Sequence, residues 1–291
     1  MKKTTLLKQM LLEKKALACP GVYDALSARM AESCGFRAVQ VSGFGFSASS
    51  LGMTDASFTS LEEVVRVTSN IARAVSIPVM TDADTGYGNA VNVWWTTRRL
   101  EETGAAGMNL EDQCLPKRCG HMDGKQLISL EEMVGKVRAA VDARKDPDFV
   151  INARTDACAV YGIEEAIRRA NAYLEAGADM IFLESPTSLE DLKRGLREIN
   201  GPVSINMLEG GKTPRLTFDE LAELGAARVS CPMFGSLVTA YALKQGFTYL
   251  REHGTSVGFE NFMPFADFKA FTDTDMVRAM EKKYISDLVK E

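Results

Sequence analysis

Short apolar runs alternate with amphipathic stretches along the whole chain. A helix-like segment that ends in glycine, followed within a few residues by an apolar run, occurs four times. The copies are AESCGFRAVQVSG, LEETGAAGMNLED, YLEAGADMIFLES and LAELGAARVSCP. Glycine tolerates the left-handed backbone conformation that ends many helices, so Gly35, Gly104, Gly177 and Gly225 are predicted helix C-terminal caps. Each predicted cap leads into a buried strand.

Eight apolar runs in all are predicted to be strands. They are residues 16–20, 38–42, 77–82, 106–111, 148–154, 179–184, 202–206 and 227–231. Runs with little alternation, such as 180–183, fit strands buried on both faces of a parallel sheet. Helical periodicity fills the gaps, and eight strand–helix units in about 250 residues is typical of a (β/α)₈ TIM barrel. A doubly wound open sheet is the alternative.

The end of the chain differs from the rest. No linker-like segment divides the 291 residues, so we predict one catalytic domain over residues 1–258 and a helical tail over residues 259–291. The tail carries the apolar residues Phe259, Phe262, Met263, Phe265, Phe268 and Phe271. A segment this apolar is expected to be covered, and we predict that it packs on a neighbouring subunit. Covering one end of the barrel is the alternative.

The net charge of −5 argues against nonspecific nucleic-acid binding, which needs a basic face, and we expect a small-molecule partner instead. Charged residues at Lys8 and at 13–15 interrupt the signal-like opening, and no stretch approaches the roughly 20 apolar residues of a membrane span. Six cysteines without close pairing indicate a reducing compartment, so a cytoplasmic protein is expected.

One cysteine stands out by its neighbours. The segment KRCGH at 117–121 surrounds the thiol of Cys119 with three potentially positive groups. Nearby cations stabilise a thiolate, so Cys119 is predicted to be reactive. Two alternatives are an ordinary small apolar cysteine and a zinc site formed with Cys114 and His121, which would lack a fourth ligand.

Polar residues follow nearly every predicted strand. They are Ser42, Gly43, Asp82, Asp84, Glu111, Asp112, Arg154, Asp156, Glu184 and Asn206. A single carboxylate after a strand is often only a helix cap. Active-site groups of a barrel project from the C-terminal ends of its strands, so the whole set predicts an active site there.

These residue types indicate a metal and an anionic substrate. Asp82, Asp84 and Glu111 supply hard oxygen ligands that suit Mg²⁺, with Mn²⁺ as an alternative. Arg154 is suited to a bidentate contact with a substrate carboxylate. The loop SGFGFSASSLG at 42–52 offers backbone N–H groups to an anion.

Two other motifs are not expected to be functional. The triplet Asp-Thr-Gly at 84–86 occurs once, in an alternating α/β pattern unlike that of aspartic proteases. Gly43, Gly45 and Ala48 match a dinucleotide fingerprint, but the following segment SSLGMTDAS at 49–57 is not expected to start a helix, so we expect no nicotinamide cofactor.

Four motifs together resemble the isocitrate lyase and phosphoenolpyruvate mutase superfamily, over almost the whole chain. They are DADTGYGN at 82–89, LEDQ at 110–113, KRCGH at 117–121 and ARTDA at 153–157. KRCGH resembles the lyase branch in particular. The resemblance implies a Mg²⁺-dependent barrel enzyme, usually a homotetramer that exchanges a C-terminal helix, with the Cys119 loop as a mobile gate.

The resemblance also implies residue roles. Asp82, Asp84 and Glu111 would hold Mg²⁺ directly or through water. A 2-hydroxy acid would lose its hydroxyl proton and break its C2–C3 bond, and Cys119 would protonate the resulting carbanion. Further catalytic residues would be Lys117, Arg154 and Glu184. Residues that bind the dicarboxylic or tricarboxylic acid substrate would be Ser42, Gly43, Phe44, Gly120, His121, Asn206 and Glu209.

Two departures from the superfamily pattern shape the expected reaction. Gln40 stands where isocitrate-type lyases have a tyrosine, so the base is open between Tyr87 and a metal-bound water. In NMLEGGKTP at 206–214, Leu208 replaces the threonine of methylisocitrate lyases. With bulky Phe44, this favours a small alkylated substrate.

We therefore expect cleavage of 2,3-dimethylmalate into pyruvate and propanoate. The alternatives are cleavage of 2-methylisocitrate into pyruvate and succinate, phosphonomutase chemistry, and oxaloacetate hydrolysis, against which Pro232 argues because those hydrolases tend to have serine there. A binding protein without catalysis is the remaining alternative, although the metal ligands and the thiol are both retained.

Overall fold

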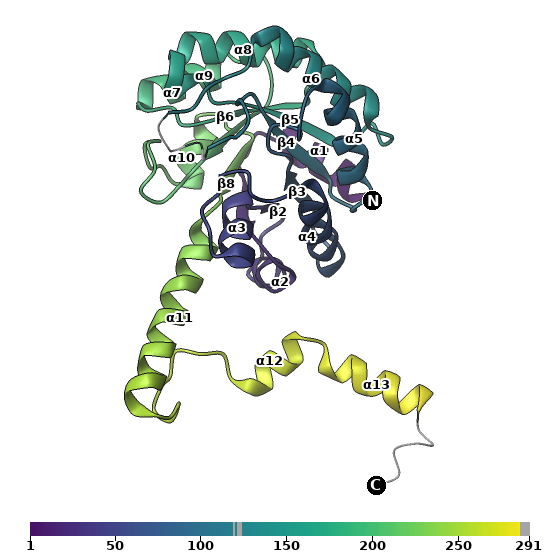
Figure 1. Ribbon diagram of the computed structural model, residues 1–291, viewed down its shortest axis with the longest axis vertical. Helices are drawn as coiled ribbons and strands as arrows, with labels where there is room; N and C mark the ends of the chain where they lie inside the picture. The colour runs from purple at the N-terminus through teal and green to yellow at the C-terminus, as the bar shows by residue number, and fades with distance from the viewer. Residues whose placement is uncertain (119, 121–123, 286–291) are drawn as a thin grey trace. The chain divides into compact units, whose positions relative to one another are not determined.

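A closed barrel of eight parallel strands, each paired with its neighbour in sequence, lies at the centre of the computed structural model, which describes residues 1–118, 120 and 124–285 (Figure 1). The strands are β1 Leu17–Val22, β2 Val39–Val41, β3 Val79–Asp82, β4 Gly107–Glu111, β5 Val150–Thr155, β6 Met180–Leu183, β7 Val203–Asn206 and β8 Arg228–Cys231. The pairing of β1 with β8, with Leu17 opposite Arg228, closes the barrel. The predicted barrel and all eight predicted strands are confirmed.

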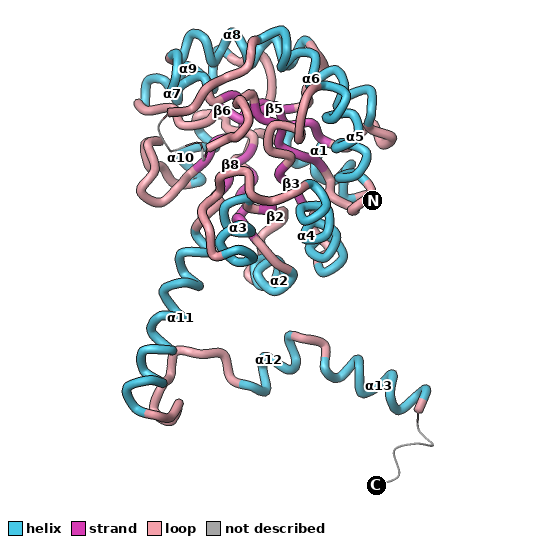
Figure 2. Tube along the Cα trace, viewed as in Figure 1, coloured by secondary structure: helices cyan, strands magenta, loops and turns pink. Residues whose placement is uncertain are grey.

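Helices occupy the segments between strands, and further helices precede β1 and follow β8 (Figure 2). They are α1 Lys3–Leu12, α2 Ala25–Ser33, α3 Gly43–Leu51, α4 Leu61–Ala74, α5 Ala90–Glu101, α6 Leu130–Ala143, α7 Ala157–Tyr161, α8 Ile163–Glu175, α9 Leu189–Glu198, α10 Phe218–Glu223, α11 Phe234–His253, α12 Phe265–Phe271 and α13 Thr274–Tyr284. Many begin at a capping side chain, such as Ser60 at α4 and Thr217 at α10, each of which accepts a hydrogen bond from the third helical residue.

The four glycines predicted to end helices do so. Gly35, Gly104, Gly177 and Gly225 have φ angles of 89°, 86°, 106° and 89°. These left-handed values are accessible to glycine because it has no Cβ atom. Each glycine therefore reverses the chain from a helix into the next strand.

No helix starts within residues 49–57, as predicted, but the assignment of residues 42–52 to a loop was wrong. Helix α3 begins at Gly43, directly after β2, and its N-cap Ser42 accepts a hydrogen bond through Oγ from the backbone N–H of Gly45 at 3.0 Å. The glycine-rich sequence gives little sign of a helix, because glycine has a low helix propensity. The Ser42 cap stabilises the helix by satisfying a backbone N–H donor. The helix N-terminus therefore does offer N–H groups to an anion.

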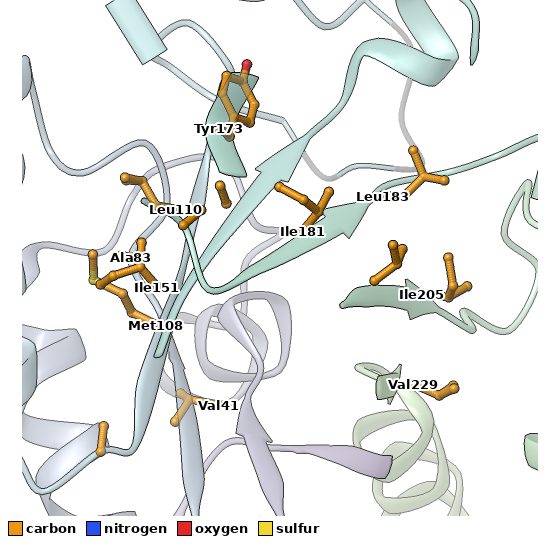
Figure 3. Packing of buried hydrophobic residues seen from close by; sticks show 14 of the residues in the cluster. Val41, Ala83, Met108, Leu110, Ile151, Tyr173, Ile181, Leu183, Ile205 and Val229 are labelled. Atoms are coloured by element: carbon orange, nitrogen blue, oxygen red, sulfur yellow. The ribbon is translucent and has the colours of Figure 1, made fainter. Parts of the chain in front are cut away.

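The layer between the strands and the surrounding helices is apolar. Outward-facing side chains from successive strands, including Val41, Met108, Ile151, Ile205 and Val229, belong to one buried cluster (Figure 3). These side chains are at most 1% exposed. The apolar runs that predicted the strands therefore form the main core.

The barrel interior changes character along the strands. Leu7, Met10 and Leu11 of α1 pack with Met80 and Met180 at the starts of strands and form a second apolar cluster. Buried polar side chains also lie inside the barrel, beginning with Arg228, the first residue of β8. Asn152 Nδ2 donates to Asn109 Oδ1 at 2.7 Å, and Arg228 Nη1 donates to Ser204 Oγ at 3.1 Å.

The chain divides into two compact units, Met1–Leu237 and Val238–Glu291. The second unit leaves many large apolar side chains exposed, among them Tyr241, Phe247, Phe262, Phe265, Val277 and Met280. The expected boundary after residue 258 and the packing of the tail on a neighbour stay predictions. None of the helices within the described ranges has the length and apolar character that crossing a membrane requires.

Candidate active site

A cavity lies at the C-terminal ends of the strands, among residues of the strands and of the segments that follow them. The predicted site residues that line it are Ser42, Gly43, Phe44, Asp82, Lys117, Gly120, Arg154, Glu184 and Asn206. The other lining residues are Gln40, Asp55, Phe182, Leu208, Pro232 and Met233. The barrel therefore brings most of the predicted site together.

Lys117 lies in the middle of an acidic group. Its Nζ is 2.6 Å from Asp55 Oδ2 and 2.9 Å from Asp84 Oδ1, and all three side chains are buried. Burial alone would lower the pKa of Lys117, but the charges of Asp84, Glu111 and Asp55 outweigh it and raise that pKa well above its ordinary value. Lys117 is therefore a firmly held cation.

The carboxylates still outnumber the cations around Lys117. Burial, and then the charge of Asp84, raise the pKa of Asp82 to about 6. Burial also raises the pKa of Glu111 well above its ordinary value, against the opposing charge of Arg154. Glu111 Oε1 is buried and has no hydrogen-bond partner among the described residues. Additional positive charge would relieve this arrangement.

The predicted metal ligands fit Mg²⁺ in part. Asp82, Asp84 and Glu111 supply oxygen atoms only, and Mg²⁺ typically keeps several waters and few protein ligands. Within the described ranges, no three acidic, histidine or cysteine side chains converge into a complete ligand set. The carboxylates therefore suit an ion held by one or two direct contacts and by water.

Arg154 is fixed from several sides. Its Nε is 2.9 Å from Asp156 Oδ2, Nη1 is 3.3 Å from Glu111 Oε2, and Nη2 is 3.6 Å from Glu184 Oε2. The guanidinium carbon lies 5.2 Å from the centre of the Phe182 ring. A planar guanidinium held in this way and lining a cavity is suited to a carboxylate ligand.

Other predicted residues have different positions. Asn206 Nδ2 donates to Glu184 Oε2 at 3.4 Å, while its Oδ1 accepts from Ser230 Oγ at 3.0 Å. Glu209 is not among the residues lining the cavity, and its buried Oε2 has no partner among the described residues. Cys119 and His121 lie outside the described residues.

The family of the chain follows from its relatives. Residues 7–250 match the family described as phosphoenolpyruvate phosphomutase. The chain belongs to the phosphoenolpyruvate mutase/isocitrate lyase superfamily. The lyase branch of the superfamily is represented by 2,3-dimethylmalate lyase of Eubacterium barkeri, which is 43% identical over 279 residues covering 96% of each chain.

Two further members of the superfamily support this placement. The 2-methylisocitrate lyase of Aeropyrum pernix is 46% identical over 248 residues, covering 84% of this chain and 78% of that protein. A crystal structure of 2,3-dimethylmalate lyase matches with a TM-score of 0.90 at 34% identity, covering 97% of this chain and 95% of that chain. The chain is a carbon–carbon lyase of the superfamily.

Two side chains near the cavity, Gln40 and Tyr87, are compared as acceptors of the substrate's hydroxyl proton. Gln40 lines the cavity, and its buried Oε1 has no partner among the described residues, but an amide does not accept a proton at neutral pH. Burial, and then the charges of Asp84 and Asp82, raise the pKa of Tyr87 well above its ordinary value. A phenol in these surroundings is a poor source of phenolate.

Sequence reasoning missed three lining residues of this superfamily member: Asp55, Phe182 and Met233. Asp55 lies in the segment between α3 and α4, where a lone aspartate carries no signal until the fold places it against Lys117. Phe182 was assigned to a buried strand, and its contact with Arg154 depends on the register of β5 and β6, which pairs the two residues. Met233 follows β8 directly, a position that could have been considered.

Proposed function

We propose that the protein is a Mg²⁺-dependent lyase that cleaves 2,3-dimethylmalate into pyruvate and propanoate. The observation that carries this proposal is the mixed lining of the cavity. Arg154 and Lys117 are suited to carboxylates, while apolar residues are suited to alkyl groups. The apolar lining consists of Phe44, Phe182, Leu208, Pro232 and Met233. The relative named 2,3-dimethylmalate lyase, which aligns over 96% of both chains, supports the same choice.

Two groups are proposed to hold the substrate. The N-terminus of α3, with Ser42 and Gly43, binds the carboxylate of the pyruvate half through backbone N–H groups. Arg154 binds the carboxylate of the propanoate half, assisted by Asn206. Mg²⁺, held by Asp82, Asp84 and Glu111, would stabilise negative charge that develops on the pyruvate half. The alkyl groups lie against the apolar lining.

The bond cleavage then needs two proton transfers. The C2 hydroxyl loses its proton, the C2–C3 electrons move to C3, and C2 becomes the ketone of pyruvate. Gln40 and Tyr87 are unsuited to accept the hydroxyl proton, so we propose Asp55, whose carboxylate lines the cavity, as the acceptor, with a metal-bound water as the alternative. Cys119 is proposed to protonate C3 of the departing half, which becomes propanoate. The contacts described above hold the side chains of Glu184 and Lys117 in position during the reaction.

Cleavage of 2-methylisocitrate is the second candidate function. The Aeropyrum pernix relative, 46% identical to this chain, favours it. On C3, that substrate has a carboxymethyl group, and so a third carboxylate, where dimethylmalate has a methyl group. Leu208 in the lining favours the methyl group, because an apolar side chain leaves a carboxylate without hydrogen bonds.

The first experiment is an assay of pyruvate release, coupled to lactate dehydrogenase, with Mg²⁺ and each of 2,3-dimethylmalate, 2-methylisocitrate and 2-methylmalate. Turnover of dimethylmalate alone is expected. Preference for methylisocitrate would select the second candidate, and no turnover of any of them would reject both. Cys119→Ser is expected to lose nearly all activity while keeping its fold and Mg²⁺ binding. An active Cys119→Ser enzyme would remove Cys119 as the acid.

We also propose that the enzyme is a cytoplasmic homotetramer. The exposed apolar side chains of the unit Val238–Glu291 support burial against other subunits. Cys19, Cys34, Cys114, Cys158 and Cys231 are free, which suits a reducing compartment. Light scattering should give four times the 31.8 kDa chain mass. A monomer that is stable at micromolar concentration would contradict the assembly.

A further inference from the structure

Lys125 has no role in the proposed function, yet it is among the most thoroughly buried lysines of the barrel. It lies between β4 and α6 and is 8% exposed. Its Nζ is 2.7 Å from Asp156 Oδ1 and also donates to the backbone carbonyl of Gly120. Burying an ammonium group is costly unless it is paired and hydrogen-bonded, so these two contacts stabilise Lys125 in its buried position.

Asp156 connects Lys125 to the candidate site. Its carboxylate is fully buried and contacts two cations at once. Oδ1 lies 2.7 Å from Lys125 Nζ and 3.1 Å from Arg154 Nη2, while Oδ2 accepts from Arg154 Nε at 2.9 Å. The backbone N–H of Asp156 donates to Asp112 Oδ1 at 3.0 Å. The orientation of Arg154 therefore depends on a carboxylate that Lys125 helps to hold.

The Gly120 carbonyl connects Lys125 to the same site from the other direction. Ser185 Oγ lies 3.1 Å from this carbonyl oxygen and 2.8 Å from Glu184 Oε1. Ser185 has a φ of 53°, a left-handed conformation that is unfavourable for a residue with a Cβ atom. Since Glu184 in turn contacts Arg154, the contacts form a closed ring of six residues. The ring runs through Lys125, Gly120, Ser185, Glu184, Arg154 and Asp156.

Gly120 fits this ring because it has no side chain. A Cβ atom at this position would collide with Arg154 Nη2 and lie 2.6 Å from Glu184 Cγ. The backbone of Gly120 therefore lies directly against two lining residues. A small shift of that backbone would change the space that a ligand meets.

We propose that Lys125 is a positioning residue: by holding Asp156 and the Gly120 carbonyl, it fixes Arg154 and Glu184 in the geometry that binds a substrate carboxylate. This proposal depends on the proposed function in one respect: it assumes that the ligand of Arg154 is a carboxylate. Without Lys125, Asp156 keeps Arg154 as a partner but loses its second cation, and the Gly120 carbonyl loses a donor. Arg154 then remains charged but is less well oriented.

A purely structural ion pair would behave differently. If Lys125 only stabilised the barrel, its loss would reduce the fraction of folded enzyme, which lowers kcat and leaves KM unchanged. A positioning role acts on ground-state binding as well as on the transition state, so it raises KM. The relative changes in kcat and KM therefore distinguish a positioning role of Lys125 from a purely structural one.

The experiment compares Lys125→Met, Lys125→Arg and Lys3→Met with the wild type, all as full-length chains. Lys3 is the matched control because its Nζ also donates to backbone carbonyls, those of Ala72 at 2.8 Å and Val75 at 2.6 Å, away from the cavity. Binding of propanoate, the half whose carboxylate Arg154 is proposed to bind, is measured by calorimetry, and KM and kcat are measured with 2,3-dimethylmalate. Ser185→Ala, which removes contacts of the ring with little change in volume, serves if Lys125→Met does not fold.

Lys125→Met is expected to weaken propanoate binding and to raise KM by about tenfold, with kcat changed by less than about threefold. Lys125→Arg should recover part of the loss, and Lys3→Met should behave as the wild type. Unchanged propanoate binding in both Lys125→Met and Ser185→Ala would overturn the proposal. If the wild type does not turn over the alkylmalates, the proposed function fails, but propanoate binding still tests whether Lys125 helps Arg154 to bind a carboxylate.

Discussion

The two ends of the barrel interior differ in what fills them. At the starts of the strands, Leu7 of α1 packs on Met80 and Met180, and the packing is mainly apolar, with Arg228 as a buried exception. At the ends of the strands, Lys117 and Asp84 are equally buried but are held by charge. Buried ion pairs contribute little net stability compared with apolar packing. The comparison indicates that one end stabilises the barrel while the other is kept polar for chemistry.

The strongest test of this division is Asp84→Asn at the polar end. We expect kcat/KM to fall by about a thousandfold, because a proposed Mg²⁺ ligand loses its charge. The free energy of unfolding should change little, since Lys117 keeps Asp55 and the repulsion between Asp84 and Asp82 disappears. Pyruvate-release kinetics and urea unfolding without Mg²⁺ measure the two effects. A large loss of stability would mean that the polar end also supports the fold.

Leu7→Ala tests the apolar end. Leu7 is fully buried, so we expect a loss of about 3 kcal/mol in the free energy of unfolding from lost contacts and a residual cavity. KM and kcat should be unchanged at a temperature where the variant is folded. Urea unfolding and the same kinetics provide the measurements. A change in KM would show that the two ends are coupled.

The same contrast explains how much of the fold could be predicted from the sequence. A strand such as β6 is buried on both faces, so its sequence is an apolar run, and the glycine cap Gly177 precedes its start. The start of α3 was missed, because its glycine-rich sequence has weak helix propensity and depends on the cap at Ser42. Local patterns therefore predicted the barrel but not every helix.

The candidate site was predictable only where it follows the strands. Arg154 and Glu184 were found because strand ends converge in a barrel. Asp55 and Lys125 lie in connecting segments, and their partners are 62 and 31 residues away in sequence. Such pairs exist only once the barrel has closed, and nothing local in the sequence indicates them.

Leu208→Thr is expected to have a smaller effect, confined to the polar end. Replacing an apolar lining residue with a hydroxyl should lower kcat/KM for 2,3-dimethylmalate relative to 2-methylisocitrate by about tenfold. The free energy of unfolding should stay within about 0.5 kcal/mol of the wild type, because the side chain is only partly buried. Competition between the two substrates gives the ratio directly. An unchanged ratio would show that Leu208 does not select the substrate.

The last prediction concerns the reactivity of cysteine thiols at the two ends of the barrel, which can be measured without any substitution. Burial raises the pKa of Cys19 at the apolar end, against the opposing charge of Arg228, and burial raises the pKa of Cys231, the last residue of β8, to about 11. Compared with a thiol of pKa 9.0, Cys231 then has about a hundredfold less thiolate at pH 7.5. In brief iodoacetamide labelling followed by peptide mass spectrometry, Cys19 and Cys231 should stay unmodified while exposed Cys34 reacts. Labelling of Cys231 should increase as the pH approaches 11. Cys119, if its cationic neighbours stabilise a thiolate, should react faster than Cys34, and slower labelling would contradict that prediction.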